Sequence, residues 1–196
     1  MKKFDTQEIN QLIAHRRSIY PKMFSGKPVD DAIVEQMLEN ANWAPTHART
    51  EPWRFTVFCG EGLQKLADFQ SNLYKELSQA EGTYDESKFT KLAQRPLECS
   101  HVISLGMARH PKQKVPEIEE VEAVACAVQN MWLTASAYGV GCYWGSGGIT
   151  YQPQALPFFE LEPTDKLLGF LYIGMPKGVW PDGRRSAIDQ KVRWVR

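Results

Sequence analysis

Two hydrophobic periodicities alternate along the chain. Apolar residues recur at helical spacing in 63–79, with Leu66, Phe69 and Leu73, whereas 53–59 alternates and is rich in β-forming residues. These patterns predict helices over 5–15, 63–79, 84–94, 117–138 and 154–160, and a further helix that begins at residue 30 or 31 and ends at Pro45. They predict strands over 53–59, 101–108, 142–144 and 167–173. Because helices and strands interleave without a repeat or linker, we expect a single domain over 1–196 with an α+β fold.

The predicted helix over 117–138 is the longest of these segments. It begins with acidic residues, as a helix N-terminus favours, and it is apolar nearly all round from Val121 to Ala137. We expect such a helix to be buried, either in the core or between subunits. The segment 192–195 (Val-Arg-Trp-Val) alternates like a strand, but no predicted strand lies beside it in the sequence.

Composition and charge exclude several classes of protein. The chain has 196 residues, 43% of them hydrophobic and 23% charged, as in ordinary globular proteins. Its 23 basic and 23 acidic residues cancel, so it lacks the basic excess of a nucleic-acid-binding protein. No apolar run approaches the ~18 residues of a membrane span, and the polar start lacks the apolar core of a signal peptide. With four scattered cysteines and no CxxC pair, we expect a cytoplasmic protein with reduced thiols.

A basic cluster, His15-Arg16-Arg17-Ser18, follows the first predicted helix. Two guanidinium groups and a hydroxyl offer the donors that a phosphate monoester requires. The alternative is a basic helix end, because cations are favoured near the C-terminal end of the helix dipole. This stretch alone leaves both interpretations open.

Two other stretches combine residues that regular helices and strands avoid. In 43–53, Pro45 and Pro52 hold the chain extended between two tryptophans, which indicates either an ordered loop with a function or a plain connector. In 145–148, three of the four residues are glycine. Such a loop either lets a backbone approach a ligand and present its N–H groups, or is a flexible turn.

Several catalytic motifs are missing from the sequence. There is no GxxxxGK[ST] loop, and Trp144 stands where a GxGxxG motif beginning at Gly139 would need its last glycine. The four histidines form no HExxH pair, so no metal site is predicted, and no GxSxG turn occurs. An enzyme without a visible acid, base or nucleophile is typical of one in which a cofactor supplies the chemistry.

Taken together and in this order, the motifs resemble the nitroreductase family of flavin enzymes, particularly its short single-domain branch. The resemblance covers nearly the whole chain. It rests on five motifs. Arg16-Arg17-Ser18 and Arg184-Arg185 resemble the two phosphate-binding motifs of the family, and the stretch from 44–47 through Pro52-Trp53 resembles its loop at the flavin edge. The segment 144–147 resembles the loop that lies against the isoalloxazine, and 169–176 resembles the penultimate strand.

The resemblance implies a mostly antiparallel central sheet flanked by helices, in an interlocked homodimer with FMN at the subunit interface. By this analogy each flavin contacts both subunits. One subunit supplies Arg16, Arg17, Ser18, Trp144, Gly145, Ser146 and the Arg184-Arg185 pair, and the other supplies Trp43, Pro45, Thr46 and His47. The terminal segment 192–195 would then extend the partner's sheet.

The activity implied by the resemblance is hydride transfer from NADH or NADPH through flavin N5 to a small electron-poor acceptor, such as a nitroaromatic or a quinone. No side chain is required as a proton donor, because water can serve. Two alternatives remain: other flavin chemistry on the same scaffold, such as reductive dehalogenation or flavin breakdown, and a flavin-binding module without turnover.

Two positions depart from the family pattern at the flavin or substrate edge. Trp43 stands where related short members often have arginine, and Glu51 stands where many have glutamine. A carboxylate at Glu51 that pointed toward the ring would disfavour the anionic reduced flavin. We expect Trp43, His47 and the segment 89–96 to shape the acceptor pocket.

Overall fold

A four-stranded antiparallel sheet forms the centre of the computed structural model, which describes residues 3–196. The strand order is β1-β2-β4-β3, so β3 lies at one edge of the sheet. The strands are β1 (Trp53–Cys59), β2 (His101–Met107), β3 (Gly141–Gly145) and β4 (Lys166–Gly174). All three strand pairings are antiparallel, which confirms the predicted sheet type.

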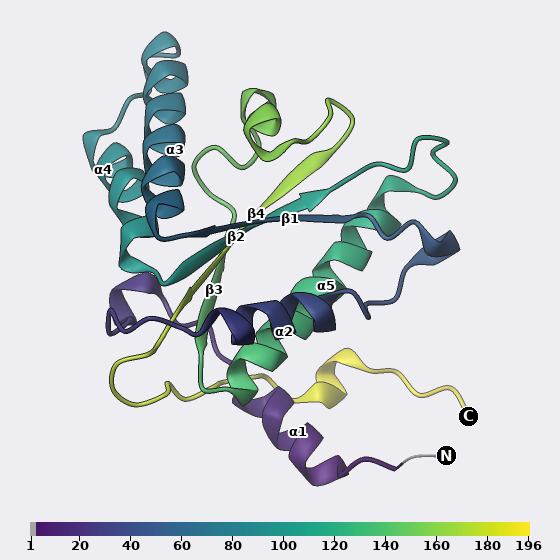
Figure 1. The fold of residues 1–196 in the computed structure, drawn as a ribbon. Helices are drawn as coiled ribbons and strands as arrows, with labels where there is room; N and C mark the ends of the chain where they lie inside the picture. The colour runs from purple at the N-terminus through teal and green to yellow at the C-terminus, as the bar shows by residue number, and fades with distance from the viewer. Residues whose placement is uncertain (1–2) are drawn as a thin grey trace.

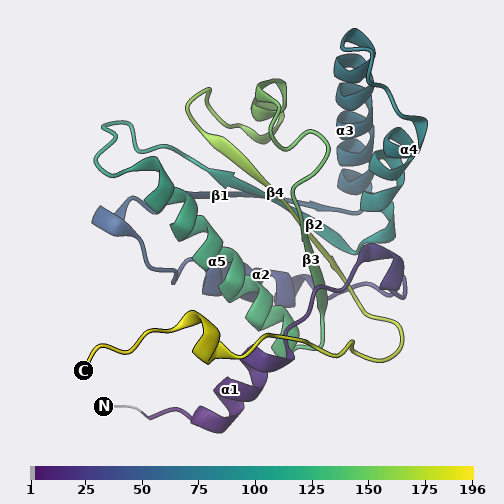
Figure 2. The same ribbon diagram turned by 180° about the vertical axis from the view of Figure 1, so that it is seen from behind.

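Helices cover both faces of this sheet (Figure 1). Helices α2 and α5 lie on one face, and α3 and α4 lie on the other, as Figure 2 shows from behind. The helices are α1 (Thr6–His15), α2 (Asp31–Ala41), α3 (Glu61–Ala80), α4 (Glu86–Gln94) and α5 (Glu117–Ala137), and the 3-10 turns are Pro21–Met23, His47–Arg49, Arg95–Glu98, Pro153–Phe159 and Ile188–Lys191. The mixed helix-and-sheet architecture agrees with the predicted fold class.

Short acidic caps explain where several helices begin. The carboxylate of Asp5 accepts hydrogen bonds from the first turn of α1, and Asp85 does the same for α4. Asp30, and not Asp31, caps α2 by accepting from the N–H of Ala32. Each cap satisfies backbone donors that have no partner inside the helix.

Helix α5 is buried between α2 and the sheet, as its apolar sequence predicts. Val124, Ala127, Val128 and Met131 are fully buried and belong to one hydrophobic cluster with residues of β2 and β4. The second cluster lies on the other face of the sheet and joins α3 and α4 to β4. The sheet therefore divides the hydrophobic core into two clusters, and α5 lies at the centre of one of them.

The segment 192–195 forms no strand within the described chain, where Trp194 and Val195 are 77% and 83% exposed. Its pairing with the sheet of a partner subunit stays a prediction. Helix α1 has no buried residue, and its apolar side chains Ile9 and Ile13 are exposed. The predicted helix over 154–160 is a 3-10 helix containing Pro157, which has no N–H to donate.

None of the helices between residues 3 and 196 is long and apolar enough to cross a membrane.

The burial of α5 can be tested at Met131, whose side chain is fully buried. Met131→Ala should lower the free energy of unfolding by about 2–5 kcal/mol, because it removes apolar contacts and leaves a cavity. Met131→Leu, which conserves the volume, should cost less than about 1.5 kcal/mol. Urea denaturation of both variants measures the difference, and equal stabilities would contradict the packing described for α5.

Candidate functional site

The basic cluster after α1 lies beside the edge strand of the sheet. Ser18 forms an isolated parallel bridge with Cys142, and the N–H of Ile19 donates to the carbonyl of Cys142 at 2.9 Å. Gly141 allows this approach, because a Cβ there would lie 3.0 Å from the Cβ of Ile19. The cluster thus lies beside Cys142 of β3, which precedes the Trp144-Gly145-Ser146 stretch by two residues.

The positive charges of three arginines from opposite ends of the chain, Arg16, Arg17 and Arg185, act on one another at this point. Burial, and after it the positive charges of Arg185 and Arg17, lower the pKa of Arg16 below its ordinary value. The guanidinium of Arg16 also lies over the ring of Trp132, 4.6 Å from its centroid. Within residues 3–196, no carboxylate forms an ion pair with any of these three arginines. Such a cluster is suited to bind an anion.

Arg17 has a second role, because it fastens the C-terminal tail to the end of α1. Its Nε donates to the carbonyl of Pro181 at 3.0 Å, and its Nη1 donates to the carbonyls of Ala14 and Arg16. Gly183 packs so closely against this guanidinium that a Cβ would collide with it. Arg17 therefore links the C-terminal tail to the end of α1 by hydrogen bonds.

A tryptophan at the start of the tail completes this attachment. The ring of Trp180 stacks on His15 with centroids 4.9 Å apart, and its Nε1 donates to the carbonyl of His15 at 2.8 Å. Farther along, Nη1 of Arg185 donates to the carbonyl of Arg184. Arg185 is the member of this pair whose positive charge contributes to the lowered pKa of Arg16.

Trp144 and Ser146 line a depression of about 400 Å³ on the α5 side of the sheet, together with Val121, Ala125, Tyr151 and Leu168. The indole of Trp144 is fixed by a hydrogen bond from its Nε1 to the carbonyl of Leu168 at 3.0 Å. Gly145 has a packing reason to be glycine, since a Cβ would lie 3.1 Å from the rings of Tyr143 and Tyr172. The loop after it is tied down where Thr150 donates to the carbonyl of Gly147.

A cavity of about 350 Å³ opens beside the same edge, lined by Tyr20, Pro21, Lys22, Lys91, Gln94, Arg95, Glu98 and Tyr143. Its walls are aromatic and basic: the ring of Tyr20 packs on Tyr143 at 4.6 Å, and Arg95 lies over the ring of Tyr172. The segment expected to shape a pocket, 89–96, thus contributes three of the lining residues. Tyr20 and Tyr143 were not among the residues predicted for the site. Their spacing from predicted site residues was the available signal. Tyr20 follows Ser18 by two residues, and strand alternation places Tyr143 on the face of β3 opposite to that of Trp144.

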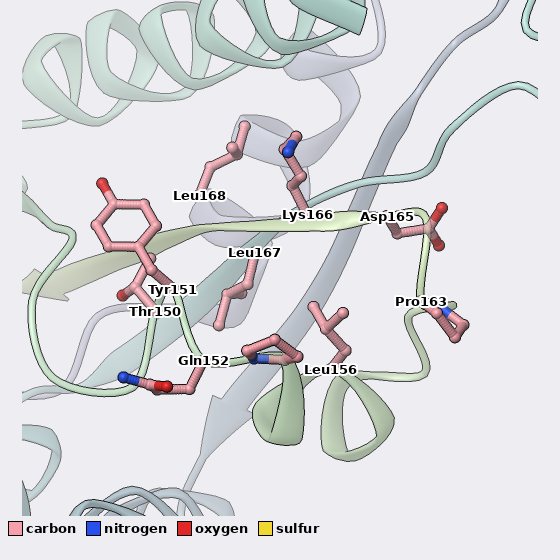
Figure 3. A pocket seen from close by; sticks show the side chains of 10 residues that line it. Thr150, Tyr151, Gln152, Leu156, Pro163, Asp165, Lys166, Leu167 and Leu168 are labelled. Atoms are coloured by element: carbon pink, nitrogen blue, oxygen red, sulfur yellow. The ribbon is translucent and has the colours of Figure 1, made fainter. Parts of the chain in front are cut away.

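A third cavity, of about 360 Å³, adjoins the Trp144 depression and shares Tyr151 and Leu168 with it. Figure 3 shows these two side chains at one end and Pro163 and Asp165 at the other. Its charged groups already have partners. Asp165 accepts from the backbone N–H groups of Arg109 and Glu162, and Lys166 pairs with Glu117 at 3.2 Å. The cavity therefore offers a ligand less free charge than the arginine cluster does.

The stretch 43–53 is an ordered loop with a constrained backbone. Ala48, Arg49 and Glu51 have φ values of 51°, 54° and 43°, in the left-handed region that residues other than glycine rarely adopt. The hydroxyl of Thr46 holds this conformation by bonding to Thr50 at 3.0 Å and accepting from the N–H of Glu51 at 3.2 Å. Strain of this kind is typical of functional loops.

Pro45, Thr46 and His47, also predicted for the site, lie in this loop, whereas Trp43 at its start lines a groove with Leu12 of α1 and Leu133 of α5. Trp43 is 84% exposed, and His47 pairs through Nδ1 with Glu119 at the start of α5. Arg16 lies over Trp132, near the other end of the same helix. Glu119 and Trp132 are thirteen residues apart, so the contacts that His47 and Arg16 make with α5 are separated by about 20 Å along the helix. Figure 1 shows the loop after α2 at one end of α5 and α1 at the other. One chain alone does not bring His47 and Arg16 together.

Comparison with known proteins identifies the family. The model described as the nitroreductase family matches residues 13–175. The chain belongs to the nitroreductase family. A nitroreductase-like protein of Bacillus cereus has a crystal structure that is 30% identical and matches with a TM-score of 0.80, covering 100% of this chain and 98% of that one.

Two further relatives extend this finding. A protein of Escherichia coli K12, named "Putative NAD(P)H nitroreductase YdjA", is 29% identical over 85% of this chain and 87% of its own length. The FMN-dependent nitroreductase NfnB of Mycobacterium smegmatis, solved in complex with NADPH, matches with a TM-score of 0.73 over 97% of this chain and 99% of that one. At 17% identity, this last likeness shows the nitroreductase fold alone.

The attachment of the tail can be tested at Trp180. Trp180→Ala removes the stack on His15 and one hydrogen bond, so trypsin should cleave after Arg184 or Arg185 about fivefold faster or more. Trp194→Ala serves as the control, because it removes an exposed tryptophan from the same tail. Time courses followed by mass spectrometry measure both rates, and an unchanged rate in Trp180→Ala would contradict the docking of the tail.

Proposed function

We propose that this nitroreductase-family chain is an FMN-dependent oxidoreductase that takes a hydride from NADH or NADPH and passes it to a small electron-poor acceptor, such as a nitroaromatic or a quinone. The observation that carries the proposal is the meeting of Arg16, Arg17 and Arg185 without a carboxylate partner in the described chain. Related proteins named as NAD(P)H nitroreductases and as FMN-dependent support the choice of cofactor.

The residues present fit the chemistry of this cofactor. A phosphate dianion matches the guanidinium groups of Arg16 and Arg185 and the hydroxyl of Ser18, which together supply charge-assisted donors. At the end of β3, the backbone N–H groups of Gly145 and Ser146 are candidate donors to an electron-rich ring edge. FMN, when bound, supplies hydride transfer at its N5, so the chain itself need only bind, orient and shield the ring.

We further propose that the active form is an interlocked homodimer, in which Trp43, Pro45, Thr46 and His47 of one subunit complete the site of the other. The separation of about 20 Å along α5 between the contacts of His47 and those of Arg16 supports this, since the two side chains cannot act on one ring within a single chain. Exposed apolar groups support it too. Ile9, Ile13 and Trp43 lie open, and Leu12, Trp43, Leu133 and Tyr138 line a groove of about 540 Å³. The pairing of 192–195 with a partner's sheet and the location in the cytoplasm stay predictions.

Removal of arginines from the cluster tests cofactor binding. Arg16→Ala or Arg185→Ala should weaken FMN binding by about 10- to 150-fold, because each deletes a charge-assisted bond worth about 1.5–3 kcal/mol. Lys177→Ala removes a positive charge from outside the cluster and should leave the affinity unchanged. Quenching of flavin fluorescence on titration into the apoprotein measures each dissociation constant. A double variant, Arg16→Ala with Arg17→Ala, that purified with its full yellow colour would contradict the assignment.

Anaerobic mixing with each nicotinamide separates the enzyme from the flavin-binding module. The visible flavin band of the wild-type protein should bleach on addition of NADH or NADPH and return on addition of a quinone. A band that stays unbleached with both nicotinamides would favour the module, and bleaching followed by release of halide from an aryl halide would favour reductive dehalogenation.

A further inference from the structure

Three carboxylates in the first turn of α5 each hold a different segment of the chain. Glu117 pairs with Lys166 at the start of β4, Glu120 pairs with Arg109, and Glu119 pairs with His47. Negative charge is favoured at this end of a helix, so the turn is a stable anchor. Glu119 is the member of the three that meets a residue able to give up a proton near neutral pH.

The pairing fixes which nitrogen of His47 is available. The contact with the Glu119 carboxylate is made by Nδ1, and a carboxylate accepts, so Nδ1 carries a proton. Nε2 has no hydrogen-bond partner among residues 3–196, and the side chain is 63% exposed. The histidine is thus oriented on one side and open on the other, which is the arrangement of a histidine that exchanges protons through its second nitrogen.

The backbone around His47 keeps this arrangement rigid. The two residues after it adopt positive φ, and the carbonyl of His47 accepts from the N–H of Thr50 at 3.2 Å. The Thr46–Thr50 hydroxyl contact closes the same turn. A strained turn that is held at three points costs free energy to maintain, and its retention is explained if the position of the side chain matters.

We propose that His47 is the proton donor to the bound acceptor and that Glu119 is the residue that positions it. This inference rests on the proposed function, in which the loop of one subunit completes the site of its partner. A quinone that receives a hydride becomes a hydroquinone anion. The proton on Nε2 passes to the free oxygen, giving the neutral hydroquinone, while His47 changes from imidazolium to neutral imidazole and keeps its Nδ1 proton on Glu119. Solvent then restores the Nε2 proton.

The first test compares an acceptor that needs a proton with one that does not. Protein reduced beforehand is mixed in a stopped-flow instrument with benzoquinone, which takes up a hydride and a proton, or with ferricyanide, which takes up one electron and no proton. His47→Gln should slow reoxidation by benzoquinone about 100-fold or more, and Glu119→Ala about tenfold, as expected when an orienting carboxylate is lost. Both variants should react with ferricyanide within about twofold of the wild-type rate.

Glu117→Ala is the matched control, because it removes a carboxylate from the same helical turn without touching His47. It should leave both reoxidation rates unchanged. Equal slowing with both acceptors in His47→Gln would show that the loop acts through packing, and unchanged rates would show that water supplies the proton. Either result overturns the inference.

The second test is independent of activity and follows the imidazole itself. In ¹⁵N spectra of the wild-type protein, neutral His47 should carry its proton on Nδ1. Glu119→Ala should shift the proton toward Nε2, and Glu117→Ala should not. If the neutral imidazole of the wild type carries its proton on Nε2 instead of Nδ1, the positioning role of Glu119 is overturned. If neither nicotinamide reduces the wild-type protein while the Nδ1 signature is present, the proposed function fails and the proton-donor role fails with it. If reduction proceeds but the acceptors are not distinguished, the proton-donor role alone fails.

Discussion

Three guanidinium groups held together without a counter-charge are the feature on which the rest of this structure depends. Burial first, and then repulsion from the like charges of Arg185 and Arg17, lowers the pKa of Arg16. The fold offsets this repulsion by fixed contacts: Arg17 donates to the carbonyl of Pro181, and Trp180 stacks on His15. A bound phosphate removes the repulsion, so the site is built in advance for an anion.

The long buried helix α5 relates this cluster to the other parts of the site. One end carries Trp132 beneath Arg16, and the other carries the acidic turn that orients His47. A helix is stiff over this length, and α5 is further fixed by its burial against α2 and the sheet. The distance between these two contacts with α5 is therefore set by the core.

Much of the fold could be predicted from the sequence, because it depends on local patterns. The strand over Trp53–Cys59 and the limits of α5 follow from alternation and from an acidic helix start. The adjacent Arg16 and Arg17 could also be recognised as a candidate anion site, because they are neighbours in the sequence. The apolar face of α1 could not be judged in this way, since periodicity shows that a face is apolar but not what covers it.

The contacts that give the site its chemistry are between segments far apart in the chain. No pattern near Arg185 indicates that it lies beside Arg16, and no pattern near Glu119 indicates that it meets His47 seventy-two residues earlier. Tyr20 and Tyr143 were missed because each is an ordinary strand or turn residue until the two rings pack together. The strained backbone at 48–51 is likewise set by the tertiary structure, as residues other than glycine seldom adopt it unaided.

The central claim is that the arginine cluster exists to hold the phosphate of a flavin. Calorimetric titration of the apoprotein with FMN and with riboflavin, which differ only in that phosphate, tests it most directly. Two charge-assisted bonds of about 1.5–3 kcal/mol each predict that FMN binds at least about 100-fold more tightly than riboflavin, with one FMN per chain. Equal affinities for the two flavins would contradict the account.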